Sequence, residues 1–200
     1  VTLPYKKAII PYLNKTVNDA NETHSVNTLM LDDKENLIGE NTDVFGFQAA
    51  YLKSLSSQEK RNKSVLILGA GGVAPSIILA LIKSNIFDIS LTNRTHEKSL
   101  FIKKNFKNIK IIDWSNFPKV LNKFDIIINA TSLGLKSSDN FQSDFSNYKK
   151  GMVYIDTIYN PPETNMIKYF RSKKIKSYNG LNMFIYQGQK AFYLWNKINP

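Results

Sequence analysis

A short apolar run that ends in glycines constrains the fold of this chain more than any other feature. Residues 65–68 (VLIL) form the run, the segment GAGGVA follows, and an apolar helical pattern begins after Pro75. Short apolar runs bounded by turn signals are typical of strands buried inside a sheet. The sequence therefore predicts a strand, a tight turn and a helix in direct succession, which is the first half of a βαβ unit.

Further strand and helix patterns alternate downstream of this turn. DISLT, IKII, FDIIINAT and MVYID are short β-rich runs, whereas SIILALIKS and EKSLFIKKNF have helical spacing. Such alternation predicts right-handed crossovers and a parallel sheet with helices on both faces. We therefore expect an α/β fold with a doubly wound parallel-sheet (Rossmann) domain.

The two ends of the chain have different patterns. VNTLML alternates like a strand, DDKEN predicts a turn, NLIGENTD contains a second short strand, and residues 44–55 have helical spacing. The polar stretch SSQEKRNK at 56–63 predicts a linker. The final segment, GLNMFIYQGQKAFYLW, predicts an amphipathic helix rich in aromatic residues.

Composition excludes several kinds of protein. The hydrophobic fraction of 42% is that of a globular chain, and no apolar run reaches the roughly 18 residues of a membrane span. The absence of cysteine excludes disulfides and thiolate metal sites, and two histidines, His24 and His96, argue against a histidine metal centre. No secretory signal pattern is visible. We expect no metal and a cytoplasmic location.

The net charge of +11 has two interpretations. Clustered basic residues would indicate nucleic acid, anionic lipid or a phosphorylated ligand as a partner. Here the lysines are scattered along the whole chain, in short clusters such as Lys149-Lys150. We interpret the charge as a consequence of composition, and we expect neither a nucleic-acid nor a membrane partner.

The glycine-rich turn also predicts a ligand. Gly69, Gly71 and Ala74 match the pattern G-x-G-x-x-G/A that opens a helix after a strand. The free N–H groups of such a helix start bind the pyrophosphate of a dinucleotide. The predicted cofactor-binding loop comprises Gly69, Ala70, Gly71, Gly72, Val73 and Ala74. The alternative is a glycine turn that binds nothing.

Two further strand ends indicate which dinucleotide binds. The second strand ends in NRTHEK, where Asn93, Arg94, Thr95 and Lys98 replace the acidic residue typical of NAD sites. An arginine here can pair with a 2′-phosphate, which favours NADP(H), unless it is an ordinary exposed arginine. FDIIINATSLG places Thr131 and Ser132 at a carboxyl edge suited to a nicotinamide ring. A plain strand-ending turn is the alternative.

Eight motifs resemble one family in their order along the chain. VTLPYK, SVNTL, GENTDVFGF, GAGGVA, NRT, INATSLG, DTIYNP and GLNMFIYQ closely resemble shikimate dehydrogenase, which reduces 3-dehydroshikimate with NADPH. The likeness extends over essentially the whole chain. It implies an NADP-dependent oxidoreductase of aromatic amino acid and chorismate biosynthesis, with shikimate and 3-dehydroshikimate as small-molecule partners. It also implies a monomer or homodimer.

The resemblance assigns roles to individual residues. It implies a catalytic Lys6–Asp43 pair, and a Lys–Asp pair suits proton delivery in a chain with no cysteine and few histidines. It also implies a substrate site at Thr2, Asn27, Tyr159 and Gln187, and a cofactor contact at Gly180. Simpler roles are a turn cap for Asn27, an N-cap for Asp43, core packing for Tyr159 and solvent exposure for Gln187.

The resemblance also implies a division into domains. An incomplete α/β substrate domain is expected at 1–60, the NADP-binding domain at 61–179, and a helix returning to the substrate domain at 180–200, with the active site in a cleft between the domains. Most family members carry a further serine-bearing half-domain before V-T-x-P-x-K, so we expect a truncated product or partial chain. A quinate/shikimate paralogue and a non-catalytic NADP-binding protein are the alternatives.

Overall fold

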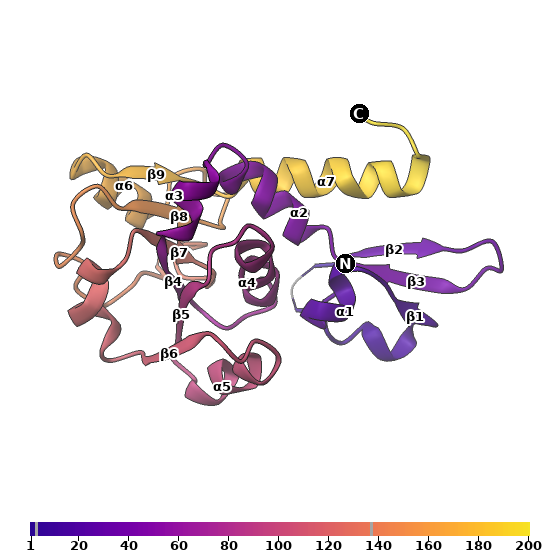
Figure 1. Ribbon diagram of the computed structural model, residues 1–200, viewed down its shortest axis with the longest axis horizontal. Coiled ribbons are helices and arrows are strands. Elements are labelled where there is room, and N and C mark those ends of the chain that lie inside the picture. The colour runs from indigo at the N-terminus through magenta and orange to yellow at the C-terminus, as the bar shows by residue number, and fades with distance from the viewer. Residues whose placement is uncertain (3, 137) are drawn as a thin grey trace. The chain divides into compact units, whose positions relative to one another are not determined.

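The computed structural model describes residues 1–2, 4–136 and 138–200, and the chain divides into two compact units (Figure 1). The first unit comprises Val1–Leu55, Gly72–Ser84 and Asn182–Pro200. The second comprises Ser56–Gly71 and Asn85–Leu181. The three-part domain division drawn from the sequence stays a prediction.

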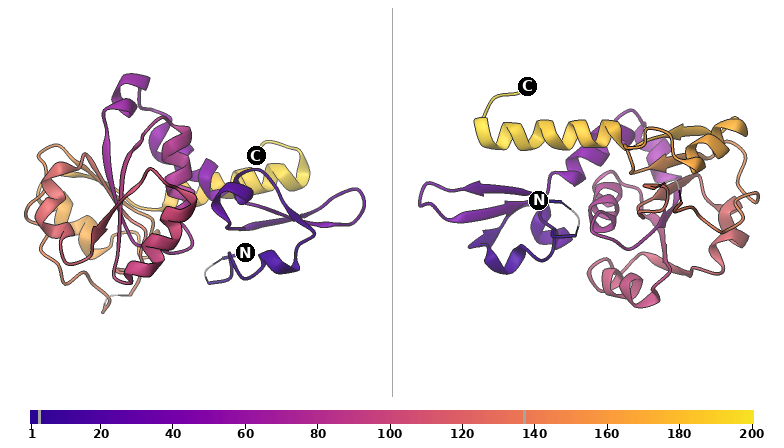
Figure 2. Two further views of the ribbon diagram at one scale, coloured as in Figure 1. Left: turned by 60° about the horizontal axis from the view of Figure 1, so that its bottom comes forward. Right: turned by 180° about the vertical axis from the view of Figure 1, so that it is seen from behind.

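The second unit is built on a six-stranded parallel sheet (Figure 2). Its strands are β4 (Ser64–Leu68), β5 (Asp88–Asn93), β6 (Lys110–Asp113), β7 (Ile126–Asn129), β8 (Val153–Asp156) and β9 (Lys176–Tyr178). They lie in the order β6-β5-β4-β7-β8-β9, which is the doubly wound order of a dinucleotide-binding sheet. The predicted fold class is confirmed, and the strand order reverses between β4 and β7.

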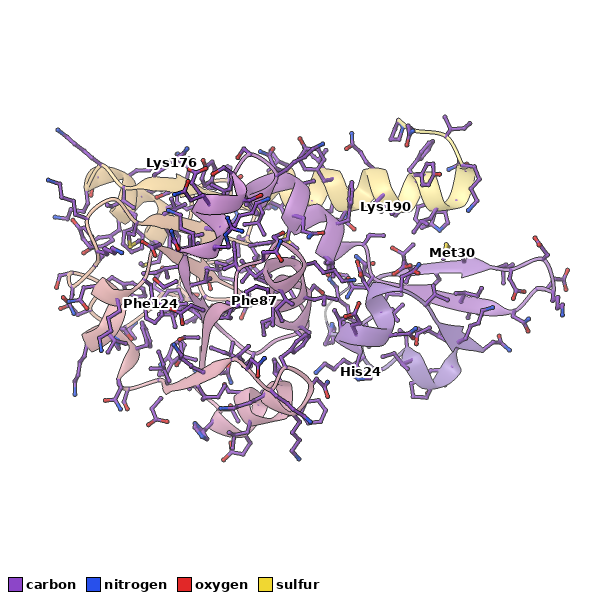
Figure 3. The ribbon with its side chains drawn as sticks, viewed as in Figure 1. His24, Met30, Phe87, Phe124, Lys176 and Lys190 are labelled. Carbon is purple, nitrogen blue, oxygen red and sulfur yellow. The ribbon has the colours of Figure 1, made fainter. Side chains whose placement is uncertain are left out.

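One face of this sheet is covered by an aromatic-rich core. Leu66 and Leu68 alternate along β4 toward this face, and both are fully buried. Against them pack η3 (Phe117–Lys123) and α6 (Asn165–Ser172), and Figure 3 labels Phe124 in the same cluster. Burial of each such apolar side chain stabilises the fold by about 1.5–3 kcal/mol. This packing fixes the strands whose ends carry the polar residues.

Two further helices belong to the second unit. The helix α5 (His96–Asn105) contacts β5 and β6. The stretch at 56–63, which is predicted as a linker, begins where the chain passes from the first unit to the second and contains the helix α3 (Ser57–Arg61), which the sequence analysis did not predict. Ser56 and Glu59 form a capping box there, which satisfies the N-terminal N–H groups of a very polar helix.

The first unit contains a three-stranded sheet and several helices. The strands β1 (Lys15–Thr16), β3 (Leu37–Glu40) and β2 (Thr28–Leu31) lie in the order β1-β3-β2, and β2 and β3 form an antiparallel hairpin. The predicted turn at DDKEN joins them, with the Asp32 carboxylate accepting from the N–H groups of Lys34 and Asn36. The helices are η1 (Ile10–Tyr12), α1 (Asp19–Thr23), α2 (Asp43–Phe47), η2 (Gln48–Leu52), α4 (Ala74–Lys83) and α7 (Leu181–Asn196).

The helix predicted at 44–55 has a different form. It begins at Asp43, and its second half, η2, is a π-helical turn that ends at Leu52. The N–H of Lys53 donates to the carbonyl of Gln48 five residues earlier, which closes this wider turn. The predicted terminal helix is confirmed as α7.

No helix within the described ranges is long and apolar enough to cross a membrane. The same part of the chain contains no group of three or more His, Cys, Asp or Glu side chains that could hold a metal ion. His24 lies exposed at the C-cap of α1 (Figure 3).

Candidate active site

A buried ion pair stands at the centre of the polar cluster in the first unit. The Lys6 Nζ lies 2.5 Å from Oδ2 of Asp43, and the two side chains are only 15% and 7% exposed. The other carboxylate oxygen of Asp43 accepts from Nδ2 of Asn27 at 2.9 Å. Three residues that are widely separated in sequence, and that the sequence singles out, therefore meet at one point.

The position of Asp43 on its helix explains its orientation. The N-cap alternative is wrong, because α2 begins at Asp43 and Thr42 occupies the N-cap position. A carboxylate in the first helical turn is stabilised by the positive end of the helix dipole. The backbone N–H of Asp43 donates to Oδ1 of Asn41 at 3.0 Å. The carboxylate of Asp43 accepts from Lys6 and Asn27.

Asn27 joins the ion pair to the last helix. Its Oδ1 accepts from the N–H of Thr42 at 2.9 Å, so it also holds the turn before α2. Its Nδ2 lies 3.3 Å from Oε1 of Gln187, which also accepts from the Thr42 hydroxyl at 3.3 Å. The solvent-facing alternative for Gln187 is therefore wrong, since its amide belongs to the same cluster as Asp43.

A glycine allows α7 to approach α2 closely enough for this contact. A Cβ placed on Gly46 would lie 2.7 Å from the carbonyl oxygen of Met183 and 2.8 Å from Cβ of Gln187. No side chain fits at such distances, so only glycine permits this crossing. Gly46 thus determines where Gln187 stands.

The other two predicted substrate residues are exposed. Thr2 is exposed in the first unit, and its carbonyl accepts from the N–H of Tyr5 at 2.8 Å. Tyr159 follows β8 in the second unit and is 44% exposed, which argues against a core-packing role. Their contacts with a substrate stay predictions.

The first half of the glycine-rich loop lies at the switch point of the sheet. Gly69 has φ +106°, and a Cβ on it would lie 2.6 Å from Cγ2 of Thr131 and 2.9 Å from the carbonyl carbon of Ala130. Glycine is required there for both conformation and space. The N–H of Ala70 donates to Oδ1 of Asn93 at 3.0 Å, so the loop is fastened to the end of β5.

The second half of the loop belongs to the first unit. The carbonyl of Gly72 accepts from the Ser25 hydroxyl at 3.2 Å, and a Cβ on Gly72 would lie 3.8 Å from Cδ of Lys6. Val73 stands at the N-cap of α4 without a side-chain cap, and Pro75 occupies the first turn. The first N–H groups of α4 are therefore available to an anion.

The end of β5 forms a hollow within the second unit. Asn93 also donates to the carbonyl of Thr95 at 2.8 Å, which shapes the turn into α5. A cavity of about 420 Å³ lies next to it, lined by Asn93, Arg94, His96, Asp113, Trp114 and Ser115. Lys98 follows in the first turn of α5. The cavity combines a guanidinium, which can pair with a phosphate, with an indole, on which a base can stack.

Comparison with known proteins identifies the family. The model of the shikimate / quinate 5-dehydrogenase family matches residues 52–173. A curated NADP(+)-dependent shikimate dehydrogenase from Pelagibacter ubique is 46% identical over 200 residues, which is 100% of this chain and 73% of that protein. The chain belongs to the shikimate / quinate 5-dehydrogenase family. The resemblance drawn from the eight motifs is thereby confirmed.

Solved structures of this family share the fold. The crystal structure of shikimate dehydrogenase from Aquifex aeolicus matches with a TM-score of 0.89 and 36% identity, over 100% of this chain and 72% of that one. The enzyme from Thermus thermophilus, solved with NADP(H) and shikimate, matches with a TM-score of 0.85 and 26% identity, over 100% of this chain and 72% of that one.

The segment after β7, which is predicted to bind the nicotinamide ring, is held by hydrogen bonds between its own residues. The Thr131 hydroxyl donates to Oδ1 of Asn129 at 2.7 Å and accepts from the N–H of Leu133 at 3.0 Å. Ser132 accepts from Leu135 through its carbonyl at 3.0 Å. A Cβ on Gly180 would collide with the carbonyl oxygen of Thr157, so glycine is required before α7. Direct contacts of these residues with a cofactor stay predictions.

Sequence reasoning gave no role to Asp156, the most buried carboxylate of this edge. Its Oδ1 accepts from the N–H of Ile158 at 3.0 Å and from Nδ2 of Asn129 at 3.1 Å. Its Oδ2 accepts from the hydroxyls of Thr164 at 2.8 Å and Tyr154 at 3.2 Å. Burial raises the pKa of Asp156, and these hydrogen bonds oppose that rise. The position of Asp156 in the motif DTIYNP was the sequence feature that could have indicated a role for it.

Proposed function

We propose that this chain catalyses the reversible NADPH-dependent reduction of 3-dehydroshikimate to shikimate. The observation that carries the proposal is the Lys6–Asp43–Asn27 cluster, found in a chain of the shikimate / quinate 5-dehydrogenase family. Its curated relatives, such as that from Pelagibacter ubique, are NADP(+)-dependent shikimate dehydrogenases. The chain is therefore an oxidoreductase that acts on a CH–OH group.

The ion pair supplies the proton chemistry of the reaction. NADPH, when bound, supplies the hydride that reduces the ketone carbon. The Lys6 ammonium donates a proton to the ketone oxygen as negative charge develops on it, and the pair regains that proton from solvent. Asp43 holds the ammonium in place at 2.5 Å, and Asn27 holds Asp43. Such positioned general acid catalysis contributes roughly 10²–10⁴-fold to the rate.

The substrate is held by polar groups around this pair. Asn27 and Gln187 share hydrogen bonds that a hydroxylated ring can replace when it binds, and Thr2 lies in the same unit. Tyr159 is assigned to the substrate carboxylate from the family resemblance. The loop Gly69–Ala74, Thr131, Ser132 and Gly180 hold the pyrophosphate and nicotinamide halves of the cofactor.

The cofactor is NADP(H) rather than NAD(H). Asn93, Arg94, Thr95 and Lys98 are the residues predicted to bind the 2′-phosphate, and no acidic residue stands directly at the end of β5. A guanidinium pairs with a phosphate in a bidentate way that a ribose hydroxyl cannot match. A cytoplasmic location, a monomeric or homodimeric state, and the lack of nucleic-acid and membrane partners stay predictions from the sequence.

The test is oxidation of NADPH in the presence of 3-dehydroshikimate, followed by absorbance. We expect turnover with this substrate, and in the reverse direction with shikimate and NADP+. Quinate is assayed in parallel, because the family includes quinate dehydrogenases. Binding of NADPH without turnover of either substrate would contradict the enzyme proposal and favour a non-catalytic NADP-binding protein.

A substitution of Arg94 tests the cofactor assignment. Arg94→Ser should weaken the binding of NADPH much more than the binding of NADH, and an equal loss for both would reject the role of Arg94.

A further inference from the structure

A histidine–aspartate pair lines the cavity at the end of β5. Nδ1 of His96, the first residue of α5, lies 3.3 Å from Oδ1 of Asp113, the last residue of β6. The two side chains are 48% and 61% exposed. Arg94 lines the same cavity. Sequence reasoning placed His96 beside the expected adenosine site but gave no role to Asp113.

An aromatic platform stands next to this pair. The centroid of the Trp114 ring lies 4.8 Å from that of Phe117 and 6.1 Å from that of Phe141, on which it stacks. The orientation of the indole is therefore fixed by packing. A fixed indole at a cavity wall offers a surface on which a base can stack. Base stacking and phosphate pairing are thus available within one cavity.

The charge of this cavity depends on the imidazole. Arg94 contributes a positive charge and Asp113 a negative one, so the lining is neutral when His96 is neutral and positive when His96 is protonated. These are the charged groups that line the cavity, while Glu97 and Lys98 follow His96 on its own helix. Imidazole groups ordinarily change charge between about pH 5 and pH 8.

We propose that the His96–Asp113 pair determines how strongly this site prefers an adenosine that carries a 2′-phosphate. Protonated His96 offsets the carboxylate of Asp113, which leaves Arg94 to bind the phosphate. Neutral His96 leaves Asp113 to repel the phosphate, so the preference weakens as the pH rises. The inference rests on the proposed function, since NADPH is the dinucleotide with a 2′-phosphate.

The experiment uses adenosine 2′,5′-bisphosphate and 5′-AMP as probes, so that no turnover is required. The chain has two tryptophans, and Trp195→Phe leaves Trp114 as the only one. Trp195 lies in α7 of the first unit, where its Nε1 donates to the carbonyl of Leu29. Fluorescence titrations at about pH 6 and about pH 8 then give the ratio of the two dissociation constants, with calorimetry as the second readout.

His96→Gln and Asp113→Asn are compared with this parent. A phosphate monoester gains its second charge near pH 6, and because this change is common to every variant, only differences between variants report on the pair. At about pH 6 the preference for the bisphosphate should be about fivefold higher in the parent than in His96→Gln, and the two should converge at about pH 8. Asp113→Asn should raise the preference at about pH 8 by a similar factor.

His24 provides the matched control, because it is the other histidine of the chain and lies exposed at the C-cap of α1. His24→Asn, which suits the left-handed backbone there, should leave the preference unchanged at both pH values. The same preference in parent and His96→Gln at both pH values would overturn the proposal, as would failure to bind the bisphosphate by either readout. Bisphosphate binding with the expected pH change but no dehydrogenase turnover would instead reject only the proposed function.

Discussion

Asp43 and Asp156 are both buried carboxylates, but their partners differ in charge. Asp43 contacts the ammonium of Lys6 at 2.5 Å. Asp156 is fully buried, and it accepts from four neutral donors, two on each oxygen. The first carboxylate lies in the first unit beside a predicted substrate site, and the second lies in the second unit at the carboxyl edge of its sheet.

This difference indicates two uses of a buried charge. A carboxylate paired with a lysine can hold a proton donor whose own charge changes during the reaction. A carboxylate held by neutral donors has no cation beside it to act as a proton donor, and it fixes the backbone and side chains that donate to it. We therefore expect loss of the first to reduce the rate and loss of the second to reduce stability.

Removal of the cation should give the largest effect. Lys6→Ala is expected to lower kcat by roughly 10²–10⁴-fold, because the developing alkoxide loses its proton donor. The affinity for NADPH, measured by fluorescence titration, should remain nearly intact. Steady-state oxidation of NADPH with 3-dehydroshikimate gives kcat.

Lys34 serves as the control for this substitution. It is an exposed lysine of the turn between β2 and β3, and only its backbone N–H is bonded to Asp32. Lys34→Ala should keep the parent kcat. A thermal unfolding curve of Lys6→Ala shows whether the protein stays folded with an unpaired Asp43, and an unchanged kcat in a folded protein would reject Lys6 as the proton donor.

Removal of the second carboxylate should mainly reduce stability. Asp156→Ala leaves the N–H of Ile158 without its acceptor, at a cost of about 1–3 kcal/mol for an unsatisfied group, and it removes one of the two bonds of the Asn129 amide, which still donates to the carbonyl of Leu133. Urea unfolding measures the loss of free energy. If the protein unfolds as the parent does but loses kcat to the extent seen for Lys6→Ala, then the contrast between the two carboxylates is wrong.

The sheet and the phosphate loop could be predicted because their signals are local. Each strand of the second unit except β9 is a short β-rich run, and GAGGVA is contiguous in sequence. The Lys6–Asp43 pair was assigned only through the order of motifs along the chain, since spacing alone does not bring residues 37 positions apart together.

The roles of Asp156 and Asp113 could not be predicted for a physical reason. Each acts through neighbours on adjacent strands or loops, and a carboxylate at a strand end looks the same in sequence whether it is exposed or buried. Helix α3 was missed because its composition is polar throughout, and the capping box from Ser56 to Glu59 was the signal that could have revealed it.

The close crossing of α2 and α7 holds Gln187 beside Asp43, and within the described residues no such crossing is involved at Asp156. Gly46→Ala should displace α7 and Gln187, because the added Cβ would lie 2.7 Å from the carbonyl oxygen of Met183. We expect a loss of about 1–3 kcal/mol in stability and a rise in the substrate KM that exceeds the change in kcat. On α7, a Cβ on Gly188 meets no atom within 4 Å, so Gly188→Ala should stabilise α7 by up to about 1 kcal/mol. Equal effects of the two substitutions would contradict the close crossing.

The smallest effect concerns pH and the charge of Asp156. In Asp156→Asn, the amide oxygen can accept from Ile158 and Asn129, while the amide nitrogen donates to the hydroxyls of Thr164 and Tyr154, so the network is retained without the charge. Burial raises the pKa of Asp156 in the folded protein, so the parent binds more protons folded than unfolded and loses stability as the pH rises through this range.

The asparagine variant lacks this titration. Its free energy of unfolding, relative to the parent, should therefore rise with pH from about pH 4 up to the raised pKa of Asp156, with a slope of at most about 1.4 kcal/mol per pH unit, and stay constant above it. Urea unfolding of both proteins at a series of pH values gives this difference, in which the titration of all other groups cancels. A difference that falls as the pH rises would mean that the four donors lower the pKa of Asp156 more than burial raises it, and the carboxylate would then stabilise the sheet edge by its charge as well as by its hydrogen bonds.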